Sequence, residues 1–201
     1  MKIIIEEYQT GWANDFLEQK DLIGSTLIDF NPLIEHIGST SVVGLCAKPT
    51  IDILVGLQAE KQLDATISPM ISQGYTYIRK YEPAMPYRRL FSSLKPLTEE
   101  VPPKVIDLND KFVRGQEFIA LTNIHIVVKD TSHWHRHLAF RDFLRAHAEL
   151  RDEYGRLKKA VSKLEFKNTN DYNHAKAEFI KNVERQALAW YNPQHKDAES
   201  S

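Results

Sequence analysis

Residues 35–56 read EHIGSTSVVGLCAKPTIDILVG, and the rest of the chain is organised around this stretch. The apolar run over residues 33–37 predicts a strand, and Gly38 follows at its end. Gly38 permits a sharp turn and the close approach of a ligand. Ser39, Thr40 and Ser41 carry hydroxyls that can cap a short helix, whose free N–H groups attract anions. The pattern therefore predicts a strand that ends in an anion-binding loop.

A second strand is predicted for residues 50–57, which are rich in β-branched side chains. Lys48 and Pro49 precede it, and proline favours extended backbone. The strand contains one carboxylate, Asp52, and a charge in so apolar a strand is rarely structural filler. We interpret Asp52 as functional. The alternative is a structural ion pair with Lys48 or with an arginine.

Length and composition set limits on the class of protein. The chain has 201 residues, 42% of them hydrophobic, which suits one domain over residues 1–192 and a flexible polar tail over 193–201. A net charge of −1 argues against bulk attraction to nucleic acid or to an anionic membrane. The single cysteine, Cys46, excludes a disulfide framework within one chain, and no apolar run is long enough to span a membrane. We therefore expect a cytoplasmic protein.

The periodicity of the remaining chain alternates strands and helices before ending in consecutive helices, which predicts an α/β or α+β fold with a helical cap. Further strands are expected at residues 2–5, 75–78, 88–94, 105–108 and 118–128, and helices at 12–29, 60–73, 132–147, 150–164 and 171–191. We expect strands 33–38 and 50–57 to be neighbours in a mixed sheet, with helices covering one face. Residues 95–119 are proline-rich and predict an excursion from the core.

A basic stripe marks the helix after the strand that carries His125. His133, His137, Arg141 and Arg145 recur every four residues and so share one helical face. A solvated surface is the simplest interpretation of such a stripe. Its position directly after His125 favours a functional interpretation here.

Ile37-Gly38-Ser39 and Asp52-Ile53 together resemble the signature of the nucleotidyltransferase superfold, in which a second acid normally follows the aspartate. With NIHIVV, HRHLAFRDFLRAH and YNHAKAEFI, the chain resembles the GrpB-like family over residues 3–185. The resemblance implies an α+β nucleotidyltransferase-like mixed sheet with flanking helices and a C-terminal helical cap. It also implies nucleotide or phosphate chemistry.

The chain departs from these patterns at three positions. Leu54 stands where the superfold has its second acid, and two carboxylates normally hold the divalent metals. Asn123 replaces the first histidine of a frequent His-apolar-His strand, and Val43 replaces a frequent proline. Any metal site therefore needs another ligand.

We expect Asp52 and His125 to share a pocket with Glu35 or His36, of which only one can join because neighbouring strand residues point to opposite faces. Such a set suits zinc or manganese better than magnesium alone. Candidate phosphate contacts carry backbone, hydroxyl or cationic donors, namely Gly38, Ser39, Thr40, Lys48, Arg88, Arg89, Arg141 and Arg145. We expect the side chains of Lys48, Arg88 and Arg141 to meet near Gly38. The alternative is that these cationic residues are ordinary surface charges or ion-pair partners.

Tyr172 and Lys176 are four residues apart on one predicted helix. They either close the site or brace that helix against the sheet. The leading hypothesis is a nucleotidyltransferase-like protein that binds a nucleotide or phosphorylated small molecule and transfers a nucleotidyl group with a metal at Asp52. There are two alternatives. One is a non-catalytic nucleotide-binding or regulatory module, which Leu54 favours. The other is an accessory domain of another enzyme.

Overall fold

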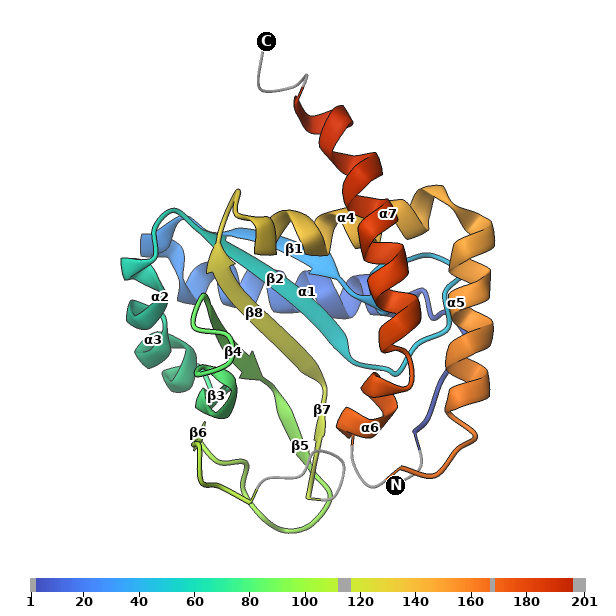
Figure 1. Cartoon of the computed structure of the whole chain (residues 1–201). Coiled ribbons are helices and arrows are strands. Elements are labelled where there is room, and N and C mark those ends of the chain that lie inside the picture. The colour runs from blue at the N-terminus through green and yellow to red at the C-terminus, as the bar shows by residue number, and fades with distance from the viewer. Residues whose placement is uncertain (1–2, 112–116, 167–168, 197–201) are drawn as a thin grey trace.

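A six-stranded mixed sheet forms the centre of the computed structural model, which describes residues 3–111, 117–166 and 169–196 (Figure 1). Its strands, in spatial order, are β1 (Leu33–Ile37), β2 (Ile51–Leu57), β8 (Thr122–Val128), β4 (Arg88–Ser92), β3 (Thr76–Ile78) and β6 (Val105–Ile106). A small second sheet pairs β5 (Leu94–Pro96) with β7 (Phe118–Ala120). The chain is therefore of mixed α+β class.

The pairing of β2 fixes the centre of this sheet. β1 lies antiparallel beside β2, which confirms the predicted neighbours, and β8 lies parallel to β2 on its other side. β4 then pairs antiparallel with β8. The region predicted as an excursion supplies β5, β6 and β7, and residues 112–116 lie outside the described part of the chain.

Helices lie on both faces of the sheet: the earlier helices cover one face, as predicted, and the C-terminal helices lie on the other (Figure 1). One face packs against α1 (Gly11–Thr26), α2 (Lys61–Ala65) and α3 (Ile67–Ser72). The other packs against α4 (Ser132–Ala146), which is joined by α5 (Ala148–Val161) and α7 (Ala177–Lys196). The C-terminal helices form the predicted cap, but over part of one sheet face.

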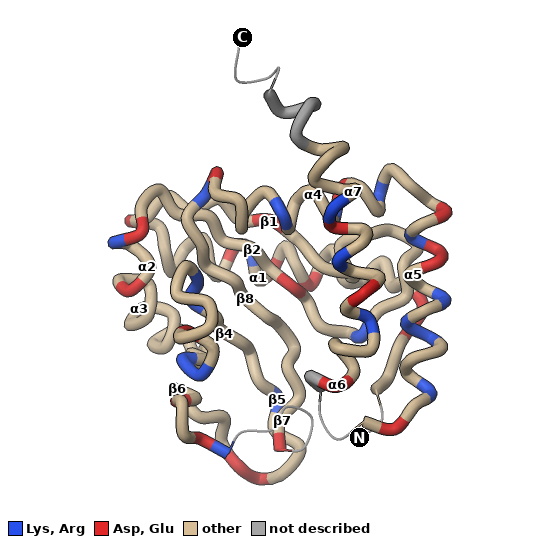
Figure 2. The backbone as a smooth tube through the Cα atoms, viewed as in Figure 1, with Lys and Arg blue, Asp and Glu red and all other residues tan. Residues whose placement is uncertain are grey.

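Two hydrophobic clusters follow from the alternation of side chains along β2. Ile51, Ile53 and Val55 join the cluster beneath α1 to α3, whereas Leu54 joins the cluster beneath α4. Figure 2 shows that charged residues of both signs lie mainly on the helices and loops, while the central strands carry little charge. The sheet is buried on both faces wherever helices cover it.

The C-terminal helical region is broken where the sequence predicted one helix. α6 (Thr169–His174) ends before Ala175 and Lys176, which form a turn ahead of α7. α7 continues to Lys196, beyond the predicted start of the tail, and residues 197–201 lie outside those described. No helix among the described residues is long and apolar enough to cross a membrane.

Candidate functional site

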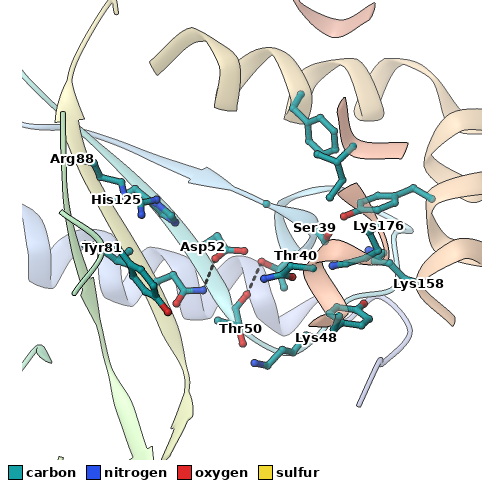
Figure 3. A pocket seen from close by; sticks show the side chains of 18 of the residues that line it. Ser39, Thr40, Lys48, Thr50, Asp52, Tyr81, Arg88, His125, Lys158 and Lys176 are labelled. Atoms are coloured by element: carbon teal, nitrogen blue, oxygen red, sulfur yellow. Dashed lines mark hydrogen bonds between the residues drawn. The ribbon is translucent and has the colours of Figure 1, made fainter. Parts of the chain in front are cut away.

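A cavity of about 480 Å³ opens on the sheet face that α4 leaves uncovered. It extends from β2, β8 and β4 to α5 and the turn between α6 and α7 (Figure 3). Its walls combine cationic, hydroxyl and aromatic side chains. The polar lining residues are Gly38, Ser39, Thr40, Lys48, Thr50, Asp52, Arg88, Asn123, His125, Lys158, Asn173 and Lys176, and the bulky ones include Tyr81, Met85, Phe140, Tyr154 and Tyr172.

The register of the central strands brings the strand residues of the site together. Asp52 on β2 lies opposite Asn123 on β8, and His125 lies opposite Leu90 on β4. Because paired residues point to the same face, these side chains project together into the cavity. The predicted pocket shared by Asp52 and His125 is thus present.

Gly38 is held directly against Asp52. Its backbone has φ 71° and ψ −171°, a conformation that is almost exclusive to glycine. A Cβ at this position would lie 2.4 Å from Asp52 Oδ2 and 2.8 Å from Asp52 Cβ. Glycine is therefore required twice, by the turn and by the contact with the carboxylate.

Asp52 accepts a hydrogen bond of 2.7 Å from Asn123 Nδ2. The remaining amide oxygen, Asn123 Oδ1, is buried and has no hydrogen-bond partner among the described residues. An unsatisfied buried acceptor costs free energy unless a ligand or water supplies a donor. The Asn123 amide therefore orients Asp52 and leaves one buried acceptor beside the cavity.

Lys158 is buried deeply, with 2% of its surface exposed. Its Nζ donates to the carbonyl of Cys46 and lies over the Tyr154 ring at 4.5 Å. Burial lowers the pKa of Lys158 to about 7, and the charge of Lys176 adds to the shift. The amine is fixed at one wall of the cavity.

Lys176 is 8% exposed and differs from Lys158 in its contacts. Its Nζ lies 3.8 Å from the centroid of the Tyr172 ring and makes no hydrogen bond or ion pair with any described residue. The Tyr172 hydroxyl is also buried without a partner in the described part of the chain. Burial lowers the pKa of Lys176 to about 8; Lys48 lowers it further, whereas Asp52 raises it. Lys176 therefore offers a donor to the cavity, whereas the Tyr172 hydroxyl is enclosed behind it.

Arg88 and His125 form the opposite wall (Figure 3). Arg88 Nη1 donates to His125 Nδ1 at 2.9 Å. A guanidinium has only donors, so Nδ1 of the histidine must accept and its Nε2 carries the proton. The pair thus presents donors toward the same cavity as the lysines.

The three other arginines predicted as phosphate contacts do not line the cavity. Arg89 points to the opposite sheet face and pairs with Asp64 and Glu82. Arg141 donates to Glu35 at 2.6 Å and to the carbonyl of His36 at 3.1 Å. The predicted meeting of Lys48, Arg88 and Arg141 therefore fails for Arg141, because a nearby carboxylate and a carbonyl engage its guanidinium.

Arg145, the fourth residue of the basic stripe, donates to the carbonyl of Ser41 at 2.8 and 3.1 Å. Arg141 and Arg145 thus hold the backbone on either side of Gly38. The Arg141 side chain is largely buried and that of Arg145 is 43% exposed, but both guanidinium groups are engaged by the protein and neither lines the cavity. The two arginines brace the loop that forms one wall of the cavity.

Neither partner predicted for Asp52 joins it. Glu35 shares the face of Asp52 but pairs with Arg141, and neither Glu35 nor His36 lines the cavity. His36 points to the other face, stacks on Phe16 and contacts Thr40 Oγ1 at 3.0 Å. Burial, with Arg145 and Arg141 nearby, lowers its pKa to about 4. The imidazole is therefore neutral and serves the packing of the loop.

These side chains do not fit a divalent metal held by the protein alone. Among the described residues, no three His, Cys, Asp or Glu side chains gather closely enough to hold one. Leu54, two residues after Asp52, is 0% exposed and lies in the cluster under α4, so it offers no ligand. The Asp52 donor set is therefore incomplete as a metal centre.

Sequence reasoning missed Tyr154 and Lys158 as cavity residues. Tyr154 was taken only as one of the apolar positions of its helix, and a lysine on an amphipathic helix is ordinarily solvated. The signal that was available is the small Gly155 between them. A Cβ added at Gly155 would lie only 3.6 Å from Cys46 Sγ. The glycine therefore lets α5 approach the loop before β2 closely.

Comparison with known proteins gives consistent matches. The model of the GrpB protein family matches residues 2–186. A UPF0157 protein of Halalkalibacterium halodurans is 32% identical over 187 residues, which are 93% of this chain and 83% of that protein. The glutamate-rich protein GrpB of Alkalihalophilus pseudofirmus is 24% identical, covering 90% of this chain and 94% of the relative.

The crystal structure of the conserved protein GrpB from Enterococcus faecalis is similar in fold, with a TM-score of 0.74 and 30% sequence identity. The superposition covers 94% of this chain and 99% of that one. The architecture described above, with its sheet and C-terminal helices, is thus shared with a solved relative.

Proposed function

We propose that this chain, which belongs to the GrpB family, binds a phosphorylated small molecule, with a nucleotide the foremost candidate, in the cavity beside Asp52. The observation that carries the proposal is the amine of Lys176, which lines the cavity, lies over the Tyr172 ring and makes no hydrogen bond or ion pair with any described residue. An anionic ligand would give this amine a charged hydrogen-bond acceptor. Lys48 lines the same cavity and adds a second cation.

The charge balance of the cavity supports an anion. Four lining side chains are basic, Lys48, Arg88, Lys158 and Lys176, and Asp52 is the one acidic side chain among the described lining residues. The chain as a whole has a net charge of −1, so this concentration of positive charge is local. Phosphate oxygens suit both arginine forks and lysine point charges.

The rest of the lining suits the sugar or base of a nucleotide. Asp52 and Asn123 Oδ1 are acceptors that match the hydroxyl and amino donors of a nucleoside. Tyr81, Phe140 and Tyr154 supply aromatic surface around them. A cavity of about 480 Å³ lies in the range of small-molecule sites.

Nucleotidyl transfer is a second candidate, favoured by the likeness of Ile37-Gly38-Ser39 and Asp52 to the nucleotidyltransferase superfold. In that case a divalent cation, magnesium, manganese or zinc, would have to arrive with the nucleotide, since the protein's own donors do not form a metal centre. The burial of Leu54 counts against a two-carboxylate mechanism. We therefore place binding before transfer.

Thermal-shift measurements with nucleotides and phosphorylated sugars, each with and without Mg²⁺, test the proposal. A ligand at one hundred times its dissociation constant stabilises the folded protein by about 2.7 kcal/mol. Lys176→Gln should remove most of this shift. Lys159→Gln is the matched control, because Lys159 is a neighbouring lysine that pairs with Glu7 outside the cavity.

Two results would decide between the candidates. Release of pyrophosphate from a nucleoside triphosphate by the wild-type protein, lost in Asp52→Asn, would favour transfer. Stabilisation by nucleotides with no such release would favour binding alone. If no phosphorylated compound stabilises the wild-type protein, the proposal is wrong.

A further inference from the structure

The cationic groups of the cavity are divided between two walls rather than gathered at one point (Figure 3). Arg88 and His125 lie on one side of Asp52 and are joined to each other by a hydrogen bond. Lys48, Lys158 and Lys176 lie on the other side. A single phosphate cannot contact the cations of both walls if the distance between the walls exceeds the size of the phosphate.

The sheet gives the scale of that separation. Arg88 lies on β4 and Asp52 on β2, with β8 between them. In the sheet register Arg88 is level with Gly56 of β2, four residues from Asp52. Two strand spacings of about 4.8 Å and four rises of about 3.3 Å therefore place the two backbones about 16 Å apart. The lysines come from α5, from the turn before α7 and from the loop before β2, on the far side of Asp52.

The electrostatic coupling of the lysines agrees with this division. The pKa of Lys176 is affected by Asp52 and by Lys48, and that of Lys158 by Lys176. On α4, in contrast, the pKa values of His133 and His137 are lowered by burial, then by Arg136 and then by Arg88. Each cationic group therefore acts on its own neighbours.

Between the two walls the cavity offers acceptors. Asp52 contributes a carboxylate, and Asn123 contributes an amide oxygen that has no partner among the described residues. These atoms suit hydroxyl or amino donors and repel phosphate. The centre of the cavity thus differs in chemistry from both of its ends.

From this arrangement we infer that the ligand is a sugar or nucleoside that carries two phosphates on separate carbons of its sugar. One phosphate contacts Lys48 and Lys176, the other contacts Arg88, and the sugar between them faces Asp52, which accepts a hydrogen bond from a free hydroxyl. This inference rests on the proposed function and narrows it to a class of ligand. Adjacent phosphates, as in a nucleoside diphosphate, would leave one wall without an anion.

Isothermal titration with two isomeric probes tests the inference. Adenosine 3′,5′-bisphosphate and ADP carry the same number of phosphates and differ in where the second one is attached. We expect the 3′,5′-bisphosphate to bind at least tenfold more tightly than ADP. Arg88→Gln should weaken the bisphosphate at least tenfold and ADP less than threefold, whereas Lys176→Gln should weaken both.

Arg89→Gln is the matched control, because Arg89 is the next residue on β4 but pairs with Asp64 and Glu82 on the other face. It should leave both affinities unchanged. Arg88→Lys, which keeps the charge, separates loss of the phosphate contact from loss of folding. Its affinity for the bisphosphate should lie between those of wild type and Arg88→Gln.

Equal affinities for the two probes, with no effect of Arg88→Gln, would overturn the inference and leave the proposed function standing. Failure of the wild-type protein to bind either probe or any other nucleotide or sugar phosphate would overturn both. The two failures are therefore distinguishable.

Discussion

On one face of β2, Ile51, Ile53 and Val55 pack against α1 to α3 and are almost entirely buried. On the other face of the same strand, Leu54 is buried beneath α4, and Asp52, two residues earlier, lines the cavity. The helical cover ends between these two residues. One strand therefore contributes to the stability of the core through one face and to the site through part of the other.

The largest expected effect on stability comes from the packed face. Ile53 is completely buried, and Ile53→Ala should lower the free energy of unfolding by about 2–5 kcal/mol, because it removes buried carbon and leaves a cavity. Chemical denaturation measures this loss, and ligand affinity of the folded protein should stay unchanged. A loss below 1 kcal/mol would mean that the two faces do not differ as described; exposed Leu33→Ala is the control.

Gly38→Ala should affect both stability and the site. The glycine-only backbone conformation costs about 1–3 kcal/mol in another residue, and the added Cβ would displace Asp52. We expect a lower melting temperature together with loss of ligand-induced stabilisation. A variant that melts normally and still responds to ligand would show that the Gly38 contact does not position Asp52.

The next largest effect on stability is expected from acid, which should destabilise the packing of α4 on the sheet. Burial, aided by Arg136 and Arg88, lowers the pKa of His137 to about 3, so the unfolded chain binds more protons between pH 6.5 and 3. Stability is therefore complete above pH 6.5 and falls with pH, by about 2 kcal/mol at pH 5 for this histidine. His36, with its pKa near 4, titrates over the same pH range and adds to this loss.

Urea denaturation at pH 7 and pH 5 measures this dependence. His137→Leu removes this titrating group and should reduce the loss of stability between these pH values, while the part due to His36 remains. An unchanged pH dependence in that variant would contradict the assignment.

The smallest effect on stability is expected from Asp52→Asn, because the amide keeps nearly the same shape and can still accept from Asn123. The unfolding free energy should change by less than about 1 kcal/mol, whereas the affinity for AMP relative to inorganic phosphate should fall about tenfold. Titration of the two ligands gives this ratio. If Asp52 is instead a structural ion-pair partner, the variant should lose about 3–5 kcal/mol of stability and keep the ratio.

The sequence was sufficient to predict the neighbouring strands β1 and β2 and the common pocket of Asp52 and His125, because local patterns and strand alternation determine both. It was insufficient for the arginines. Arg88 and Arg89 are adjacent, and only the register of β4 against β8 decides which one faces the cavity.

Partners distant in sequence explain the other differences. Arg141 resembled a phosphate ligand, but Glu35, 106 residues away, occupies its guanidinium. From the sequence, Lys158 resembled a solvated residue of a helix. In the structure the loop at Cys46 packs over it, and the carbonyl of Cys46 accepts a hydrogen bond from its amine. Lys176 was predicted within a continuous helix, and the break at Ala175 that places it in a turn has no strong sequence signal.

The parallel pairing of β2 with β8 has a consequence for how the chain folds. Asp52 and Asn123 are hydrogen-bonded across 71 positions of sequence, so the two sides of the site meet only when a long loop closes. Closing a loop of that length costs about 4 kcal/mol of chain entropy by the logarithmic scaling. High contact order slows folding. We therefore expect the cavity to be completed late, after the β1–β2 hairpin and the C-terminal helices have formed from contacts nearer in sequence.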